Sequence, residues 1–126
     1  MVPPLDILAP GGTLIVASAC SEGFGSGAFR AAQKRLVELG PDAFLATLLG
    51  KQLADVDEWQ TEMQLKPMRV GRVQLYTTGL TGDDVALTGV EPVASAGAAV
   101  VAALAYANDP ALAVIPEGPY VVPVVA

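Results

Sequence analysis

The sequence predicts a small α/β fold in which helices cover both faces of a parallel, or mostly parallel, β-sheet. Residues 13–19 form an apolar, β-branched run without polar alternation, which is typical of a strand that is covered on both faces. Residues 72–78 alternate between polar and apolar and indicate a second strand, which Gly79 closes. Apolar residues at helical spacing fill the chain between them. Because strands joined through helices run parallel, this order favours a parallel sheet.

The chain between these strands is expected to begin with two helices. The first begins after Ser26, a residue type that caps helix N-termini well, and stops at Gly40-Pro41. Asp42 is expected to cap a second, short helix over residues 43–49. The apolar side of the first helix carries Phe29, Ala32, Leu36 and Leu39.

A third helix is predicted from the segment Asp55-Val56-Asp57-Glu58, which has the acid and the later glutamate of a capping box. Val56, Trp59 and Met63 follow at spacings of three and four residues, so this face is expected to be buried. Proline disfavours a helical conformation at the residue before it, and the helix is therefore expected to end before Pro67.

The last third of the chain is expected to add two helices and two short strands. The helices lie near residues 83–87 and over the alanine-rich residues 95–107, and Asn108-Asp109-Pro110 ends the second helix. Residues 112–115 then predict a third strand, and residues 120–125 an edge strand. Residues 1–126 are thus expected to form a single Rossmann-like domain, because this length is typical of one domain.

The composition excludes several classes of function. Of the 126 residues, 52% are hydrophobic and 16% charged, and the net charge of −6 argues against binding to nucleic acid. No uncharged run reaches the roughly 20 apolar residues that a membrane span needs. The N-terminus lacks the cationic segment of a signal peptide, and a single cysteine cannot form an internal disulfide. We therefore expect a cytoplasmic protein that binds neither nucleic acid nor membrane.

The chain contains no histidine. This absence removes the residue most used as a catalytic base and as a zinc or nickel ligand, together with every Ser-His-Asp or Cys-His arrangement. Neither a complete catalytic set nor a metal site is expected within these residues.

A glycine-rich loop follows the first predicted strand. Its sequence, Gly23-Phe24-Gly25-Ser26-Gly27-Ala28, fits the dinucleotide fingerprint in which backbone N–H groups at a helix N-terminus hold a pyrophosphate. The acid that should bind ribose does not end a second strand, because Asp42, at nearly the right spacing, opens a helix. Two interpretations stay open: a module that binds a nucleotide or an S-adenosyl compound through residues 23–27, and a loop whose glycines only supply positive φ.

Three further groups of residues are candidates for chemistry. Cys20 ends the first strand, and its activation as a nucleophile would depend on a helix N-terminus or on Arg30, Lys34 or Arg35, so a small buried side chain is the simpler role. Trp59 is either a core residue or a ligand contact. Nearby carboxylates could form a metal or acid–base pair, but acids in a first helical turn also complement the helix dipole; they are Asp55, Asp57, Glu58 and Glu62.

Five segments, taken in order, resemble one known family. They are residues 8–16, Cys20-Ser21-Glu22-Gly23-Phe24-Gly25, Asp57-Glu58-Trp59-Gln60, residues 77–80 and Val114-Ile115-Pro116-Glu117-Gly118. Their order and spacing are similar to those of the C-terminal domain of the nickel-dependent lactate racemase family, and the similarity runs from Leu8 to Val122. The resemblance implies an excised C-terminal domain of a two-domain racemase or epimerase of 2-hydroxy acids.

Members of this family bind substrate in the cleft between their two domains. The resemblance implies that an N-terminal domain holds a nickel pincer nucleotide through histidines and a lysine, and that hydride transfer from the hydroxyl-bearing carbon gives a transient 2-keto acid. This chain would then add one wall of the cleft and be inert alone. The residues expected in that wall are Trp59, Cys20, Gly23 and Gly25.

Two departures from the family pattern accompany this resemblance. Ala19 stands where the family often has an acid, and a substrate-binding Gln and Lys of the family would precede Met1. The implied partners are the N-terminal domain of the same protein and a small 2-hydroxy acid, and an exposed cleft face would favour weak self-association. A purely structural interaction domain, without any small-molecule ligand, is the third interpretation.

Overall fold

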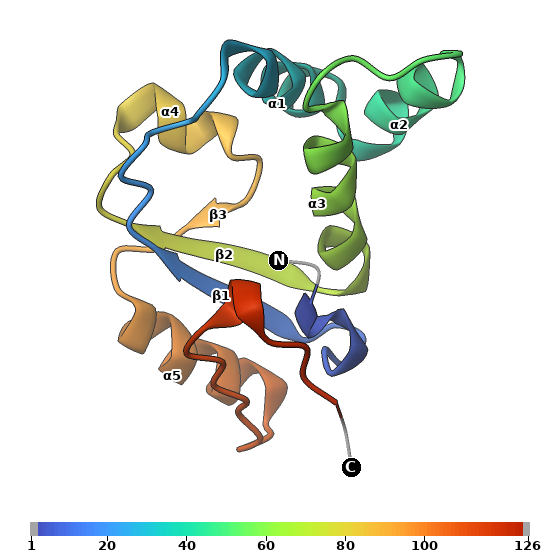
Figure 1. Ribbon diagram of the computed structural model, residues 1–126. Coiled ribbons are helices and arrows are strands. Elements are labelled where there is room, and N and C mark those ends of the chain that lie inside the picture. The colour runs from blue at the N-terminus through green and yellow to red at the C-terminus, as the bar shows by residue number, and fades with distance from the viewer. Residues whose placement is uncertain (1–2, 125–126) are drawn as a thin grey trace.

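The computed structural model describes residues 3–124 and has a parallel three-stranded sheet with helices on both faces, which confirms the predicted fold class (Figure 1). The strands are β1 (Thr13–Ser18), β2 (Arg72–Thr77) and β3 (Glu91–Pro92), in the order β1-β2-β3. Thr13 lies opposite Arg72 in the first pair of strands, and Gln74 lies opposite Glu91 in the second. The strands predicted from residues 13–19 and 72–78 are therefore present.

Three helices connect β1 to β2, one connects β2 to β3, and one follows β3. They are α1 (Gly27–Leu39), α2 (Pro41–Leu49), α3 (Glu58–Val70), α4 (Gly82–Leu87) and α5 (Ala96–Ala107), with the 3-10 turns η1 (Pro3–Asp6) and η2 (Gly118–Tyr120). α5 packs on β1 and β2 from one side of the sheet, and α3 packs on β2 from the other (Figure 1). No helix within residues 3–124 has the length and apolarity that crossing a membrane requires.

The main hydrophobic core lies among the helices rather than on the sheet. The Arg72 guanidinium lies over the Tyr106 ring of α5, so Val73, the next residue of β2, faces the α3 side, where it is buried. In β1, Leu14, Ile15 and Val16 are only half-buried, and Ala17 is exposed. The core cluster is built by α1, α2 and α3 and consists of Leu36, Phe44 and Leu65, with Leu45, Leu48 and Met68 packed against it.

Helix α1 begins and ends where the sequence predicts. Ser26 Oγ accepts the Phe29 N–H at 3.0 Å, as an N-cap residue does. Gly40 ends the helix with a φ of 81°, and its N–H donates to the Leu36 carbonyl at 2.9 Å. Leu39 departs from the predicted apolar side, because 48% of it is exposed.

Three helix boundaries differ from the prediction. α3 begins at Glu58 after Asp57, so Asp55 is not its cap and Val56 lies outside the helix. α2 already begins at Pro41, so Asp42 lies in the first turn rather than at the cap. α3 continues through Pro67, which is buried. Proline removes one N–H donor from a helix, but here the loss falls in the last turn, where the Gly71 N–H closes on the Pro67 carbonyl at 3.0 Å.

The C-terminal quarter of the chain does not form the predicted strands. Residues 112–115 have no regular secondary structure, and the third strand is instead Glu91–Pro92. The predicted edge strand at residues 120–125 is also wrong for its described part, since Tyr120 ends η2 and residues 121–124 are irregular; Val125 lies outside the described residues. Four prolines, which have no N–H to donate to a neighbouring strand, flank these two segments or lie within them. They are Pro110, Pro116, Pro119 and Pro123.

Candidate functional site

The loops after β1 and β2 meet at the carboxyl edge of the sheet, where α/β proteins usually bind ligands. Thr77 Oγ1 donates to the Ala19 carbonyl at 3.4 Å and accepts the Gly79 N–H at 3.3 Å. The backbone of Gly79 lies so close that a Cβ atom there would stand 2.1 Å from the Ala19 carbonyl oxygen and 2.5 Å from that of Cys20. The two loops therefore form one tightly joined edge.

The loop after β1 has the backbone conformation that its glycines predict. Gly23 and Gly25 have φ values of 61° and 75°, and Cys20 also has a positive φ, 47°. The Gly23 N–H donates to the Cys20 carbonyl at 2.9 Å, and the Gly25 N–H donates to the Glu22 carbonyl at 3.4 Å. Two of the N–H groups that a phosphate-binding loop would present are thus used within the loop itself.

Cys20 is half-buried at this edge, and its Sγ donates to Ser18 Oγ at 3.4 Å. The sequence predicts a small buried side chain at this position, and Cys20 is therefore less buried than expected. The cations named as activators of a thiolate are held in ion pairs elsewhere: Arg30 with Asp84, Lys34 with Glu38, and Arg35 with Glu58. No partner that would make Cys20 nucleophilic accompanies it within residues 3–124.

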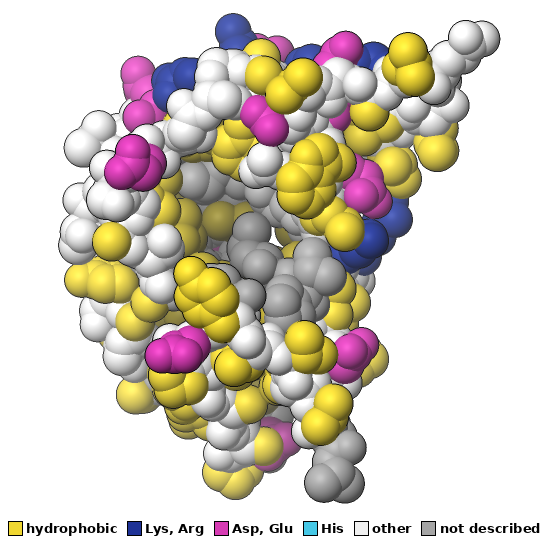
Figure 2. Space-filling model, in the orientation of Figure 1, with side chains coloured by type: hydrophobic (Ala, Val, Ile, Leu, Met, Phe, Trp, Pro, Cys, Tyr) yellow, Lys and Arg dark blue, Asp and Glu magenta, His cyan; other side chains and the backbone are white. Residues whose placement is uncertain are grey.

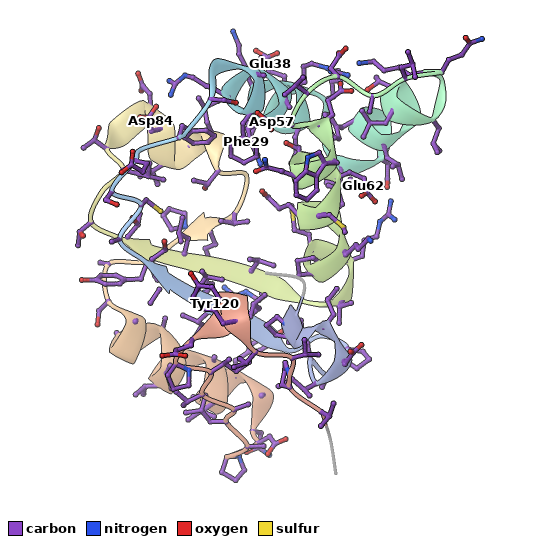
Figure 3. The ribbon with its side chains drawn as sticks, in the orientation of Figure 1. Phe29, Glu38, Asp57, Glu62, Asp84 and Tyr120 are labelled. Carbon is purple, nitrogen blue, oxygen red and sulfur yellow. The ribbon has the colours of Figure 1, made fainter. Side chains whose placement is uncertain are left out.

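Asp57 joins the glycine loop to the start of α3. Ser26 Oγ, the N-cap of α1, donates to the Asp57 carboxylate, and Gln60 Nε2 donates to the other carboxylate oxygen at 3.0 Å. Figure 3 labels Asp57 and Phe29 at this junction. The carboxylate lies at the positive end of α1, where an anionic ligand of a nucleotide-binding loop would sit, and it would repel a phosphate. This geometry disfavours the interpretation of residues 23–27 as a nucleotide site.

Replacing Ser26 by alanine is expected to lower the free energy of unfolding by about 1 kcal/mol, because it removes the N-cap of α1. Ser95→Ala is a matched control, since Ser95 caps α5 by accepting the Ala98 N–H at 3.3 Å. Urea unfolding in an Asp57→Ala background measures the coupling between Ser26 and Asp57. In that background the loss of free energy of unfolding should become smaller for Ser26→Ala but not for Ser95→Ala. An equally smaller loss for Ser95→Ala would contradict the interaction between Ser26 and Asp57.

Trp59 is 62% exposed, although helical spacing predicts it to be buried. Val56 is exposed as well and Met63 is only half-buried, so the predicted buried face of this helix is wrong. The residues of α3 that pack inward are mostly polar; they are Glu58, Thr61, Gln64, Leu65 and Pro67. A pattern based on hydrophobicity assigns such residues to the solvent side, which inverts the orientation of the helix.

The segment from the end of α2 to the first turn of α3 exposes several large apolar side chains. Leu49, Leu53, Val56 and Trp59 are all more than half exposed, and they are called the Trp59 surface below. Figure 2 shows hydrophobic side chains gathered at this α2–α3 corner. Exposed apolar groups in one region indicate a surface that meets a ligand or another protein surface.

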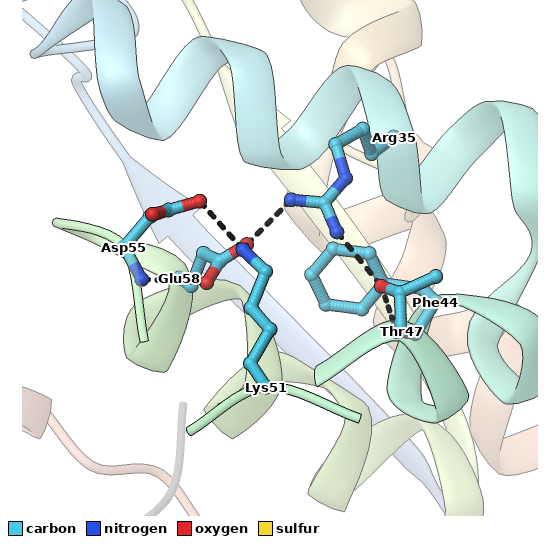
Figure 4. A network of polar contacts seen from close by, with 6 residues as sticks. All are labelled: Arg35, Phe44, Thr47, Lys51, Asp55 and Glu58. Atoms are coloured by element: carbon cyan, nitrogen blue, oxygen red, sulfur yellow. Dashed lines mark hydrogen bonds and ion pairs between the residues drawn. The ribbon is translucent and has the colours of Figure 1, made fainter. Parts of the chain in front are cut away.

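Glu58 explains the orientation of α3, because its carboxylate is only 2% exposed and needs cationic partners. Arg35 Nη1 lies 2.5 Å and Lys51 Nζ 2.7 Å from Glu58 Oε1 (Figure 4). The Asp55 N–H donates to Glu58 Oε2 at 2.7 Å, which is one half of the predicted capping box. Lys51 also reaches Asp55 Oδ2 at 2.5 Å.

These contacts set the ionisation state of Glu58. Burial opposes its ionisation, but the hydrogen bonds from Lys51, from the Asp55 backbone and from Arg35 outweigh burial and lower the pKa of Glu58 to about 2. Of the carboxylates considered as a metal or acid–base pair, Asp55, Asp57 and Glu58 are therefore used in structural contacts. No group of three or more His, Cys, Asp or Glu residues in the described part of the chain is placed to hold a metal ion.

Fold and site together define a small α/β domain with an exposed Trp59 on α3 and a positive-φ loop from Cys20 to Gly25 after β1. No protein-family model, curated protein or solved structure matches the chain. Of the residues expected in a cleft wall, Cys20, Gly23 and Gly25 share the loop, and Trp59 lies two residues after the junction at Asp57. Sequence reasoning missed the contact between Ser26 and Asp57, because residues 31 positions apart give no local signal of contact.

Proposed function

We propose that this chain is the C-terminal domain of a lactate-racemase-like protein that racemises or epimerises a 2-hydroxy acid. The exposure of Trp59 in the first turn of α3 is the observation that supports it most. A large aromatic side chain in solvent is typical of a surface that meets a ligand or a second protein surface. Through Asp57 and Ser26 this turn is joined to the end of the glycine loop, which supports a common role for the two segments.

The resemblance implies a nickel pincer nucleotide in the complete protein, and the residues of this chain do not fit a nickel site. The sequence has no histidine, and the buried carboxylate of Glu58 is already neutralised by Arg35 and Lys51. Imidazole is the nitrogen ligand that nickel most readily takes from a protein. The metal would therefore be held by the N-terminal domain, and no chemical step is assigned to the residues described here.

The contribution of this chain is a wall that shapes the cleft and excludes water. Trp59 offers a flat apolar surface, and the positive-φ loop from Cys20 to Gly25 offers backbone that approaches a ligand without large side chains. The partners in this proposal are the N-terminal domain of the same protein and a small 2-hydroxy acid in the cytoplasm. Alone, the chain is expected to have no racemase activity.

Trp59→Ala tests the role of the wall in the product of the coding sequence that includes the region upstream of Met1. We expect kcat/KM for racemisation of a 2-hydroxy acid such as lactate, followed by chiral chromatography, to fall at least about tenfold, because the apolar wall is lost. The free energy of unfolding of the chain should change by less than about 0.5 kcal/mol, since the side chain is exposed. Tyr106→Ala, an exposed aromatic on α5, is the matched control.

Three outcomes would contradict the proposal. The first is an upstream region without histidines or a lysine, and the second is a complete product that racemises none of a panel of 2-hydroxy acids. The third is micromolar binding of NAD or S-adenosylmethionine to the chain in calorimetry, which would support the nucleotide interpretation instead. Equal losses of activity for Trp59→Ala and Tyr106→Ala would remove Trp59 from the cleft wall.

A further inference from the structure

β1 lies at one edge of the three-stranded sheet and pairs only with β2 (Figure 1). The Gly12 carbonyl accepts the Arg72 N–H at 2.9 Å, so Gly12 and every second residue after it direct their backbone groups toward β2. The residues between them direct their N–H and C=O groups to the outer edge of β1; they are Thr13, Ile15 and Ala17. Within residues 3–124 these outward groups have no hydrogen-bond partner.

The two edges of the sheet differ in their protection against further pairing. Sheet edges are normally blunted by shortness, by charged side chains or by proline, because unpaired backbone groups attract other strands. β3 has all three features, since it is two residues long and consists of Glu91 and Pro92. β1 has none of them: its residues Thr13–Ser18 include neither a charge nor a proline, and their register with β2 continues without a bulge. The sheet therefore has one protected edge and one edge that is suited to a further strand.

The side chains of β1 also lack full cover. α5 packs on β1 from one side of the sheet, whereas α3, on the other side, packs on β2. Leu14, Ile15 and Val16 are only half-buried, although they alternate between the two faces. A strand added beside β1 would cover apolar side chains on both faces, and it would itself need apolar or β-branched side chains on both faces.

We infer that the outer edge of β1 binds an extended, uncharged segment of a partner polypeptide, which adds to the sheet as a fourth strand. Only extended backbone carries N–H and C=O groups at the spacing of this edge, about 3.3 Å per residue. A second copy of the chain is a poorer occupant. The six residues of one edge are a small contact beside the roughly 1,200–2,000 Å² that stable dimers bury, and each copy has a net charge of −6.

Amide hydrogen exchange of the isotope-labelled chain tests this binding. In the chain alone, the outward N–H groups of β1 should exchange fast, and the alternate ones, which pair with β2, should exchange slowly. The probe is a short peptide of alternating valine and threonine that carries lysines at one end for solubility. At saturating concentration it should slow the exchange of the outward groups at least about tenfold and leave the alternate groups unchanged.

The matched control peptide has the same sequence and charge but carries N-methyl groups on successive central residues. Both of its edges are then blocked, because an N-methyl group removes the donor and collides with a neighbouring strand. This peptide should leave the exchange of the outward groups unchanged. The comparison of the two peptides uses the parent chain, so it does not depend on the folding of any variant.

Ala17→Pro removes one outward N–H donor and keeps the ladder with β2, because an edge strand accepts proline where its N–H faces away from the sheet. It should raise the dissociation constant of the probe peptide at least about tenfold. Ala17→Val also enlarges the side chain but keeps the N–H, and it should bind the probe as the parent chain does. Slow exchange of the groups that face β2 establishes that both variants are folded.

The inference is overturned if both peptides slow the outward groups equally, if the probe leaves them unchanged, or if the two Ala17 variants bind the probe equally well. Slow exchange of the outward groups without peptide also overturns it. If that slowing grows with protein concentration, a second copy occupies the edge, and if it is the same at every concentration, the chain covers the edge itself. None of these results bears on the proposed racemase function, since residues 13–17 belong neither to the Trp59 surface nor to the loop from Cys20 to Gly25.

Discussion

Glu58→Gln is expected to lower the free energy of unfolding at pH 7 by about 3 kcal/mol, because removing one member of a buried ion pair leaves the other members without compensation. The carboxylate is 2% exposed and accepts hydrogen bonds from Arg35, from Lys51 and from the Asp55 backbone. Glutamine keeps the shape of the side chain but leaves two cations without their shared anion. Urea unfolding followed by circular dichroism measures the loss.

The same variant should lose most of its stability change in acid. The pKa of Glu58 in the folded chain, about 2, lies below its ordinary value of 4.5, so the folded state binds this proton less readily than the unfolded state. The stabilisation is therefore fully present above pH 4.5 and is lost as the pH falls from 4.5 toward 2. Unfolding measured at pH 7, 4.5 and 3 should show the two chains converging.

Glu38→Gln is the matched control for this prediction. Glu38 pairs with Lys34 at 3.7 Å on the surface, with its side chain 59% exposed, and exposed pairs contribute little to stability. Its substitution should change stability by less than about 0.5 kcal/mol at any of these pH values. A similar loss for both variants, or a loss for Glu58→Gln that does not change between pH 7 and pH 3, would contradict a buried ion pair at Glu58.

Local signals are sufficient for the elements whose boundaries depend on neighbouring residues. Ser26 and Ser95 are N-caps because a serine Oγ accepts an N–H three residues later, and the residues on either side of each serine are enough to predict this. β1 and β2 likewise follow from runs of six residues with strand-forming side chains. β3 could not be predicted, because a strand of two residues, one of them Pro92, is too short to show an alternation of polar and apolar side chains.

The orientation of α3 depends on contacts with distant residues, and the sequence pattern inverts it. Arg35 and Lys51 come from other parts of the chain, and their charges draw Glu58 inward. With Glu58, Thr61, Gln64 and Leu65 turned inward, Trp59, which points about 100° away from Glu58, lies on the exposed side of the helix. The exposure of Trp59 therefore follows from the ion pairs of Glu58 with Arg35 and Lys51. The spacing of hydrophobic residues in the sequence gives no sign of these pairs.

For the loop after β1, the sequence predicts the backbone conformation of the glycines but not the contacts that the loop makes. Positive φ at Gly23 and Gly25 follows from glycine chemistry, and the structure confirms it. The sequence predicts only that Gly79 closes a strand, yet its backbone lies against the carbonyls of Ala19 and Cys20. Such close approach between two loops is decided by the register of β1 and β2, which brings their ends to the same level.

Gly79→Ala is expected to lower the free energy of unfolding by about 3 kcal/mol, because the added Cβ would stand 2.1 Å from the Ala19 carbonyl oxygen. Backbone atoms cannot rotate away as a side chain can, so the loops after β1 and β2 must separate. The hydrogen bond from the Gly23 N–H to the Cys20 carbonyl lies in the displaced loop. Its amide should therefore exchange with solvent faster in the variant.

Gly97→Ala in α5 adds the same methyl group where the nearest atom, Ser95 Oγ, is 3.9 Å away. It should raise the free energy of unfolding by about 0.5 kcal/mol, since alanine favours a helix more than glycine does. Urea unfolding of the two variants thus compares the same added methyl group at two positions. The free energy of unfolding is expected to fall for Gly79→Ala and to rise for Gly97→Ala. If Gly79→Ala is as stable as the parent chain and the Gly23 amide keeps its exchange rate, the loops after β1 and β2 are not in contact, and the edge that joins Cys20 to the rest of the site is not rigid.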